Sequence, residues 1–256
     1  MAAAEQSRPA DPAIVAHRGA MSERPQNTMA AFQRALELGA DVVEIDVRTS
    51  RDGRLVIRHD ATVDRNTDGT GRVSDLTFRE LRGLDAGSWF DPAYSREIVP
   101  SLREVLLWGA DRTVLLLDLK ERGREFAEAV AAEIRAYGNP EAVVIGVRTP
   151  EQAREFREVI PECRQLGFMG QPDLIEEFAE AGVAIIRLWL HREGWLADHP
   201  QLAARVREAG AKLMVNGTDG RPEEAEALLA FQPDWILIDD IVRLKESIAA
   251  LRAADS

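Results

Sequence analysis

Short runs of β-branched and apolar residues alternate with longer amphipathic stretches along almost the whole chain, and this alternation restricts the fold most. It is typical of repeated strand–helix units that build a parallel sheet. Gly39, Gly182 and Gly210 each stand just past an expected helix, where a left-handed helix end costs least, so the units read as an internal repeat. The eight strands that the pattern predicts are Ile14–Ala16, Val42–Val47, Val114–Leu119, Ala142–Val147, Arg164–Phe168, Val183–Leu188, Lys212–Val215 and Trp235–Ile238.

The regular alternation stops between Asp60 and Pro100, in a stretch rich in Gly, Asp and Thr. The stretch is too long for an ordinary strand–helix loop, so we expect an inserted subdomain there, over one mouth of a barrel. Eight parallel units favour a TIM-type (β/α)₈ barrel over an open doubly wound sheet, which usually has fewer strands. The prediction is therefore one α/β domain over residues 1–256, a TIM barrel with a small cap inserted after the second strand, at about residues 60–100.

The net charge and the cysteine content limit which partners the protein can bind and which cellular compartment it suits. The formal net charge of −12 is spread over the chain and argues against nucleic acid or an anionic membrane surface as a partner. The only cysteine, Cys163, excludes an intramolecular disulfide and a cysteine-based zinc cluster, which favours a reducing compartment. Residues 1–12 carry no signal-peptide pattern, and no stretch is long and apolar enough to span a membrane. We therefore expect a cytoplasmic protein without stable membrane insertion.

Charged residues stand where the first three predicted strands end, which in a barrel is the face that carries the active site. They are His17 and Arg18 on the first strand, Glu44 and Asp46 on the second, and Asp118 and Lys120 on the third. Because strand side chains alternate, Glu44 and Asp46 point to one side, and Asp118 and Lys120 do likewise. Two inward-facing charged pairs would be costly without a function.

A hard divalent cation fits these residues. Oxygen ligands from Glu44, Asp46 and Asp118 suit Mg²⁺ or Ca²⁺ better than zinc. Arg18 and Lys120 could then neutralise the charge of a phosphate group, and the pKa of a histidine lies near neutrality. His17 and His59 could thus remove and donate the protons that P–O cleavage requires. The set predicts metal-assisted phosphate chemistry.

Structural explanations compete with each of these interpretations. The carboxylates could instead form an ion-pair network with Arg18 and Lys120. Asn27-Thr28 and Asp239-Asp240 are most simply helix N-caps. His191 and His199 have no carboxylate partner in a comparable pattern, and Trp189 and Trp235 fit a core or a rim better than a substrate platform.

Four short motifs carry a resemblance to a known family: His17-Arg18-Gly19, Gln26-Asn27-Thr28, Glu44-Ile45-Asp46 and His59-Asp60. They resemble the hallmarks of the glycerophosphodiester phosphodiesterase family, closely over the N-terminal half and more loosely beyond Lys120. The resemblance implies a TIM barrel with an inserted cap, a divalent metal held by the carboxylates, and His17 and His59 as general acid and base. The implied activity is hydrolysis of a small glycerophosphodiester to glycerol 3-phosphate and an alcohol.

The chain departs from the family pattern at three places. Asp118 stands where the family commonly has Glu, Gln26 replaces a Glu, and Val215–Thr218 stands where a tryptophan is often found. Two alternatives stay open: a lysophospholipase D-like or other phosphodiesterase on the same scaffold, whose apolar entrance Trp89-Phe90 could line, and a non-catalytic binder of phosphate ligands. The sequence does not indicate the oligomeric state.

Overall fold

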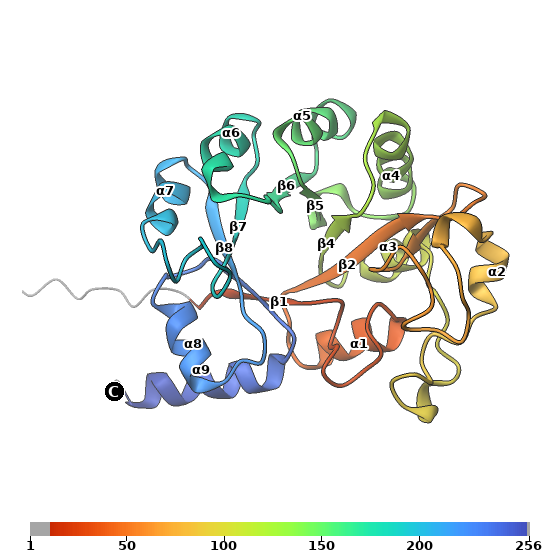
Figure 1. The fold of residues 1–256 in the computed structure, drawn as a ribbon, viewed down its shortest axis with the longest axis horizontal. Helices are drawn as coiled ribbons and strands as arrows, with labels where there is room; N and C mark the ends of the chain where they lie inside the picture. The colour runs from red at the N-terminus through yellow and green to blue at the C-terminus, as the bar shows by residue number, and fades with distance from the viewer. Residues whose placement is uncertain (1–10, 255–256) are drawn as a thin grey trace, which may run out of the picture.

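The computed structural model describes residues 11–254 and shows a closed barrel of eight parallel strands surrounded by helices (Figure 1). The parallel strands are β1 (Ala13–Ala16), β2 (Val42–Thr49), β4 (Val114–Leu119), β5 (Val143–Val147), β6 (Arg164–Gly167), β7 (Ile185–Trp189), β8 (Lys212–Asn216) and β9 (Trp235–Ile238). Their order around the barrel is β1-β9-β8-β7-β6-β5-β4-β2, and pairing of β1 with β2 closes the ring. The predicted TIM barrel is confirmed.

An additional strand, β3 (Leu55–Ile57), pairs antiparallel with the end of β2 and was not predicted. Val47 of β2 lies opposite Ile57, and Thr49 lies opposite Leu55, so the two strands form a hairpin that extends beyond the barrel. His59 lies two residues after the end of β3. The hairpin therefore returns the chain from the end of β2 and delivers His59 beside the carboxylates of that strand.

Helices alternate with the barrel strands and cover the outside of the ring (Figure 1). They are α1 (Met29–Glu37), α3 (Leu102–Gly109), α4 (Arg124–Tyr137), α5 (Pro150–Val159), α6 (Ile175–Glu180), α7 (Leu202–Glu208), α8 (Pro222–Leu229) and α9 (Ile241–Ala254). Side-chain caps fix the starts of two of these helices: Ser101 forms a capping box with Glu104 at α3, and Thr149 accepts from the Gln152 N–H at α5. The largest apolar cluster lies between this helical layer and the strands.

The inside of the barrel is filled by a second apolar cluster of ten buried side chains, contributed by β1, β2, β4 to β9 and the residue after β6. On several strands the next inward-facing position toward the carboxyl end is polar or charged. Glu44 follows Val42 on β2, Asp118 follows Leu116 on β4, and Asn216 follows Met214 on β8. An apolar floor thus lies beneath a polar layer, at the end of the barrel where parallel strands finish.

Residues 60–100 form the inserted segment, which contains α2 (Phe78–Arg82) and two short 3₁₀ turns, Val73–Asp75 and Pro92–Tyr94. It has its own small apolar cluster, centred on Val63, Leu81 and Val99. The remaining 3₁₀ turns of the described chain, Pro140–Ala142 and Pro172–Leu174, precede β5 and α6. The first of them moves the start of β5 to Val143, one residue later than predicted.

No helix within residues 11–254 is long and apolar enough to cross a membrane. The expectation that the chain starts without a signal peptide concerns residues 1–12, and residues 1–10 lie outside the described part.

Candidate active site

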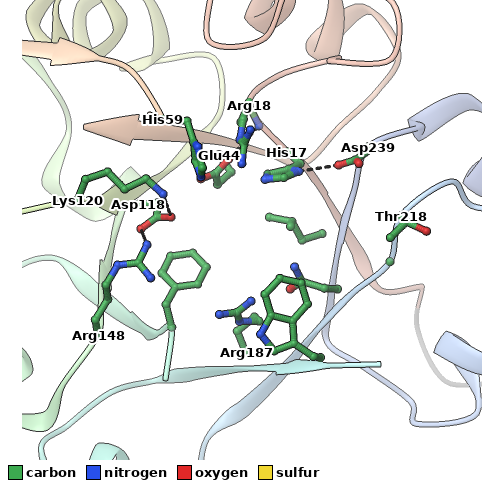
Figure 2. A pocket seen from close by; sticks show the side chains of 15 residues that line it. His17, Arg18, Glu44, His59, Asp118, Lys120, Arg148, Arg187, Thr218 and Asp239 are labelled. Atoms are coloured by element: carbon green, nitrogen blue, oxygen red, sulfur yellow. Dashed lines mark hydrogen bonds and ion pairs between the residues drawn. The ribbon is translucent and has the colours of Figure 1, made fainter. Parts of the chain in front are cut away.

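A pocket of about 310 Å³ opens at the carboxyl ends of the barrel strands (Figure 2). Six of the seven residues that the sequence singles out line it, and the seventh, Asp46, is buried directly beside them in the same ion-pair network. The lining residues are His17, Arg18, Glu44, His59, Asp118, Lys120, Arg148, Phe168, Arg187, Trp189, Asn216, Gly217, Thr218, Leu237 and Asp239.

Glu44, Asp46 and Asp118 come together as the sequence predicts. Asp46 and Asp118 are register partners on the neighbouring strands β2 and β4, and Glu44 lies two residues before Asp46 on the same face. All three side chains are buried, and each offers an oxygen within 4.8 Å of the other two. Three negative groups so close and so deeply buried require positive charge among them.

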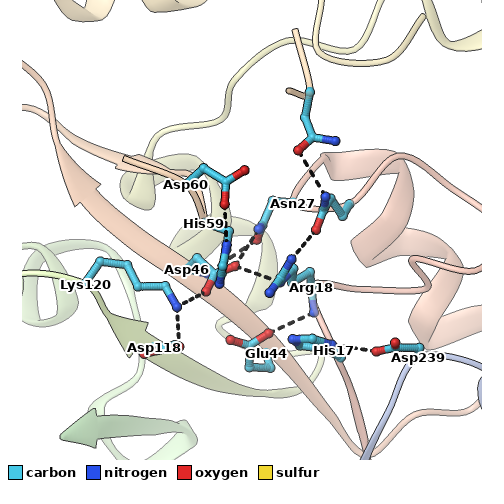
Figure 3. A network of polar contacts seen from close by, with 12 residues as sticks. His17, Arg18, Asn27, Glu44, Asp46, His59, Asp60, Asp118, Lys120 and Asp239 are labelled. Carbon is cyan, nitrogen blue, oxygen red and sulfur yellow. Dashed lines mark hydrogen bonds and ion pairs between the residues drawn. The ribbon is translucent and has the colours of Figure 1, made fainter. Parts of the chain in front are cut away.

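Basic side chains supply part of that charge (Figure 3). The Lys120 ammonium lies 2.7 Å from Asp46 Oδ1 and 2.5 Å from Asp118 Oδ2, and Arg18 Nε lies 3.3 Å from Asp46 Oδ2. Arg148 pairs with the other oxygen of Asp118. Burial alone would raise the pKa of Asp46, but Lys120 and Arg18 outweigh it, so its pKa is lowered.

Glu44 differs because no basic side chain forms an ion pair with it among residues 11–254; its carboxylate accepts a 2.8 Å hydrogen bond from the backbone N–H of Arg18. Burial and the charge of Asp46 raise the pKa of Glu44 to about 8. A carboxyl group held near two others without a cationic partner of its own suits a metal ligand. The donor set, three carboxylates and no sulfur, fits a hard divalent cation such as Mg²⁺ or Ca²⁺.

Each histidine is held by a carboxylate through its Nδ1 atom. His17 Nδ1 donates to Asp239 Oδ1 at 2.6 Å, and His59 Nδ1 donates to Asp60 Oδ1 at 2.7 Å. This leaves Nε2 of both rings for chemistry. Burial lowers the pKa of His17, but Asp239 and Glu44 reverse the effect and the net pKa is raised. Burial also lowers the pKa of His59, where it prevails over the attraction of Asp46, so that pKa stays below its ordinary value.

The turn after β1 explains the His17-Arg18-Gly19 motif. Arg18 and Gly19 both adopt left-handed backbone conformations, with φ of 54° and 81°. A Cβ on Gly19 would lie 2.7 Å from the backbone of Ala31, so only glycine fits. The uncommon conformation of Arg18 directs its N–H at Glu44 while its side chain reaches Asp46.

The Gln26-Asn27-Thr28 motif has more than the capping role. Thr28 caps α1 as predicted, through a hydrogen bond from the Ala31 N–H. Asn27 goes beyond a cap, because its Nδ2 donates to Asp46 Oδ2 at 2.7 Å. Gln26 Oε1 accepts from the Arg18 guanidinium at 2.6 Å, so the departure from the family pattern retains a contact with that arginine.

One expectation about the acidic residues changes. Asp240 caps α9 through the Arg243 N–H, but Asp239 does not: it holds His17. Trp189 lies at the pocket rim and Trp235 lies in the barrel interior, both as expected. His191 and His199 are exposed, and neither lines the pocket.

Arg148, Arg187 and Asn216 line the pocket and were missed. The alternation of side chains along a strand could have indicated at least one of them, because it predicts which positions face into the barrel. Arg187 interrupts the apolar run of β7 at an inward position, two residues after Ile185, just as Asp118 follows Leu116 on β4.

Comparisons with known proteins agree with this geometry. Residues 17–243 match the model of the glycerophosphoryl diester phosphodiesterase family. A glycerophosphodiester phosphodiesterase of Caldanaerobacter subterraneus subsp. tengcongensis is 34% identical over 233 residues, covering 89% of this chain and 93% of the relative. The crystal structure of a glycerophosphodiester phosphodiesterase from Agrobacterium tumefaciens is similar with a TM-score of 0.78 at 30% identity, covering 92% of this chain and 100% of that one. An Oleispira antarctica phosphodiesterase, solved with the product sn-glycerol-3-phosphate, shares the fold with a TM-score of 0.81 at 24% identity, covering 93% and 97% of the two chains.

Proposed function

Because the chain belongs to the glycerophosphoryl diester phosphodiesterase family, we propose that it hydrolyses a small glycerophosphodiester to glycerol 3-phosphate and an alcohol, with His17 and His59 as general acid and base. The observation that carries this proposal is the pair of histidines at one pocket, each held at Nδ1 by a carboxylate, beside three clustered acidic side chains. This is the arrangement that proton transfer on both sides of a phosphoryl group needs.

Glu44, Asp46 and Asp118 would hold the divalent cation, Mg²⁺ or Ca²⁺. Such an ion supplies Lewis-acid stabilisation of the negative charge on the phosphoryl oxygens. Arg18 and Lys120 lie beside the same carboxylates and would bind the remaining phosphoryl charge. The pairing of Asp118 with both Lys120 and Arg148 also supports the rival interpretation, an ion-pair network without metal, so metal dependence has to be measured.

The proposed reaction uses the free Nε2 atoms. One histidine takes the proton of the attacking hydroxyl as its oxygen bonds to phosphorus. The bond from phosphorus to the alcohol oxygen breaks, and the other histidine donates its proton to that oxygen. The attacking hydroxyl belongs either to water or to the glycerol group of the substrate. Attack by water gives glycerol 3-phosphate and the alcohol directly. Attack by the glycerol hydroxyl releases the alcohol first, and water then opens the cyclic phosphate to give glycerol 3-phosphate.

The lysophospholipase D-like alternative would need an apolar entrance. Trp89 and Phe90 pack edge to face with ring centroids 5.8 Å apart, and Trp89 is 41% exposed, but neither lines the pocket. No contact of these rings favours a lipid substrate, so we retain the small diester.

The test is hydrolysis of glycerophosphocholine and glycerophosphoethanolamine by EDTA-treated protein, before and after separate addition of Mg²⁺, Ca²⁺ and Mn²⁺. We expect metal-restored release of glycerol 3-phosphate. His17→Ala and His59→Ala should each lower kcat about 100-fold or more, the scale of general acid–base catalysis. His199→Ala, at an exposed position outside the pocket, is the matched control and should retain wild-type turnover. Near-normal turnover of both site variants would overturn the assignment of the two histidines.

A further inference from the structure

The barrel mouth divides into two arcs. One arc, formed by the adjacent strands β9, β1, β2 and β4 with the β3 hairpin, carries both histidines, the three clustered carboxylates, Arg18 and Lys120. The opposite arc, β5 to β8, carries Arg148, Arg187, Trp189 and Asn216, and the chemistry proposed above uses none of them. Figure 2 shows Arg187 across the pocket from His17 and Glu44.

Arg187 is a buried cation without an anionic partner. It is 6% exposed, and no acidic side chain within residues 11–254 forms an ion pair with it. Its Nε is buried and has no acceptor. Burial lowers the pKa of Arg187 to about 9, which still leaves it charged at neutral pH. Buried charges in proteins are normally paired, so this one calls for an anion from outside the chain.

Aromatic rings hold the Arg187 guanidinium in place. It lies 4.2 Å from the ring centre of Trp189 and 5.1 Å from that of Phe168. Phe168 in turn packs onto Gly146 of β5, where a Cβ would collide with its ring. Cation–π contacts stabilise a guanidinium and fix its direction, but they leave its N–H groups available for an oxyanion.

Two residues near Arg187 also have buried polar atoms without a hydrogen-bond partner. Trp189 Nε1 and Asn216 Oδ1 are buried without a hydrogen bond, and Trp189 and Asn216 are register partners on β7 and β8. The indole N–H is a donor, and the Asn216 amide can rotate to present its NH₂ group. Together with Arg187 they offer donors on one wall of the pocket, which is the chemistry that binds a carboxylate or a phosphate.

The position of Arg187 indicates which part of a substrate it would meet. Arg187 lies across the pocket from His17 and Glu44 (Figure 2), on the wall opposite the carboxylates beside which the reacting phosphoryl group is proposed to bind. The glycerol end of a glycerophosphodiester has no ionisable group. A further anion that reaches Arg187 would therefore be carried by the alcohol.

We propose that Arg187, Trp189 and Asn216 form a specificity subsite for a carboxylate or phosphate monoester carried by the leaving alcohol. This inference rests on the proposed diesterase function and names the substrate class of the same pocket. Arg148 is not the central group of this subsite, because Asp118 already engages it.

The test uses four diesters of glycerol 3-phosphate that share a two-carbon arm and differ at its end: a hydroxyl, a trimethylammonium, a carboxylate and a phosphate monoester. We expect kcat/KM for one or both anionic substrates to exceed that for the hydroxyl substrate by about tenfold or more, as a charge-assisted contact would give. The carboxylate and phosphate arms identify which anion the subsite takes.

Variants of Arg187 test whether this residue causes the preference for anionic substrates. Arg187→Met keeps the length and packing of the side chain without its charge, and should reduce the ratio of anionic to hydroxyl kcat/KM to about one. Arg187→Lys should restore part of that ratio. Arg164→Met removes a charge from the exposed amino end of the adjacent strand β6 and should keep the wild-type ratio.

A second measurement separates this inference from the diesterase function. Binding of the same four diesters to His17→Ala protein is followed by calorimetry, which needs no turnover. If the wild type hydrolyses the diesters with equal kcat/KM, or if Arg187→Met keeps the preference, the subsite is overturned and the diesterase function stands. If no diester is hydrolysed with any metal, the diesterase function is overturned, and an anion preference in binding that disappears with Arg187→Met still supports the subsite. Equal binding of all four would then overturn the subsite as well.

Discussion

The two histidines of the site depend on carboxylates that come from very different places in the chain. His59 is held by Asp60, its immediate neighbour, whereas His17 is held by Asp239, 222 positions away. The first contact is visible in the sequence as a His-Asp pair. The second exists only because β9 pairs with β1 when the barrel closes, which brings the ends of the two strands together. Asp239 therefore acts as a positioning residue for His17.

Replacement of Asp239 tests this role. Asp239→Asn removes the carboxylate that orients His17 and raises its pKa, so we expect kcat to fall about tenfold or more with a smaller change in KM. Because the pKa of His17 falls when its partner is lost, the limb of the pH–rate profile that His17 controls should move to lower pH.

Asp240→Asn is the matched control at the next position. Asp240 caps α9, and Asn caps a helix about as well as Asp, so this variant should change stability little and keep both kcat and the pH profile. Equal effects of the two substitutions on kcat would mean that the loss does not come from the contact between Asp239 and His17.

At the scale of elements, the eight barrel strands were predictable because most are short apolar runs bounded by turn or helix signals, and three of them end in charged residues. β3 was missed because a strand of three residues is too short to show alternation. β7 starts at Ile185 rather than Val183 because the Val183 N–H still bonds to Phe178 in the turn after α6. Tertiary contacts, which the sequence pattern does not contain, decide such boundaries.

Of the candidate site, the seven predicted residues converge, whereas the wall of Arg148, Arg187 and Asn216 was not foreseen. The seven stand in short motifs that combine charge with strand ends. The wall residues are single polar positions on separate strands, and only the closed barrel brings them to one pocket. Arg187 alone could have been noticed, as a charge at an inward position of an apolar strand.

The capping box of α3 gives a prediction for an element. Ser101 Oγ accepts from the Glu104 N–H, and the Glu104 carboxylate accepts from both the N–H and the hydroxyl of Ser101. Ser101→Ala should therefore lower the free energy of unfolding by about 1 kcal/mol. Chemical denaturation measures the loss, with Ser95→Ala, at an exposed position in the inserted segment, as the control that should change little. An unchanged Ser101→Ala protein would show that the box contributes nothing to the fold.

For the whole molecule, the proposed metal site at the clustered carboxylates would couple cation binding to folding. A cation that binds only the folded chain, at 100 times its dissociation constant, stabilises it by about 2.7 kcal/mol. In a protein of this size that corresponds to a rise in Tm of roughly 5–10 °C. We expect this rise with Mg²⁺ or Ca²⁺, and its loss in Glu44→Gln, which removes the carboxylate without a side-chain ion pair.

Glu133→Gln is the control for the metal titration, because Glu133 lies on α4 away from the three carboxylates. The Tm of this variant should rise with Mg²⁺ or Ca²⁺ as much as the Tm of the wild type does. A Tm that no divalent cation changes would favour the ion-pair network over the metal site.

The division of the barrel mouth into two contiguous arcs has a consequence for how such a protein can diversify. The two proposals place bond cleavage on one half of the ring and recognition of the leaving group on the other, and each half is built on its own run of neighbouring strands. On these proposals, substitutions on β5 to β8 would alter which diesters are accepted while the two histidines and the carboxylates stay in place. A lineage could in this way change its head-group preference through a few substitutions at inward positions of four strands, with the residues of the other half unchanged.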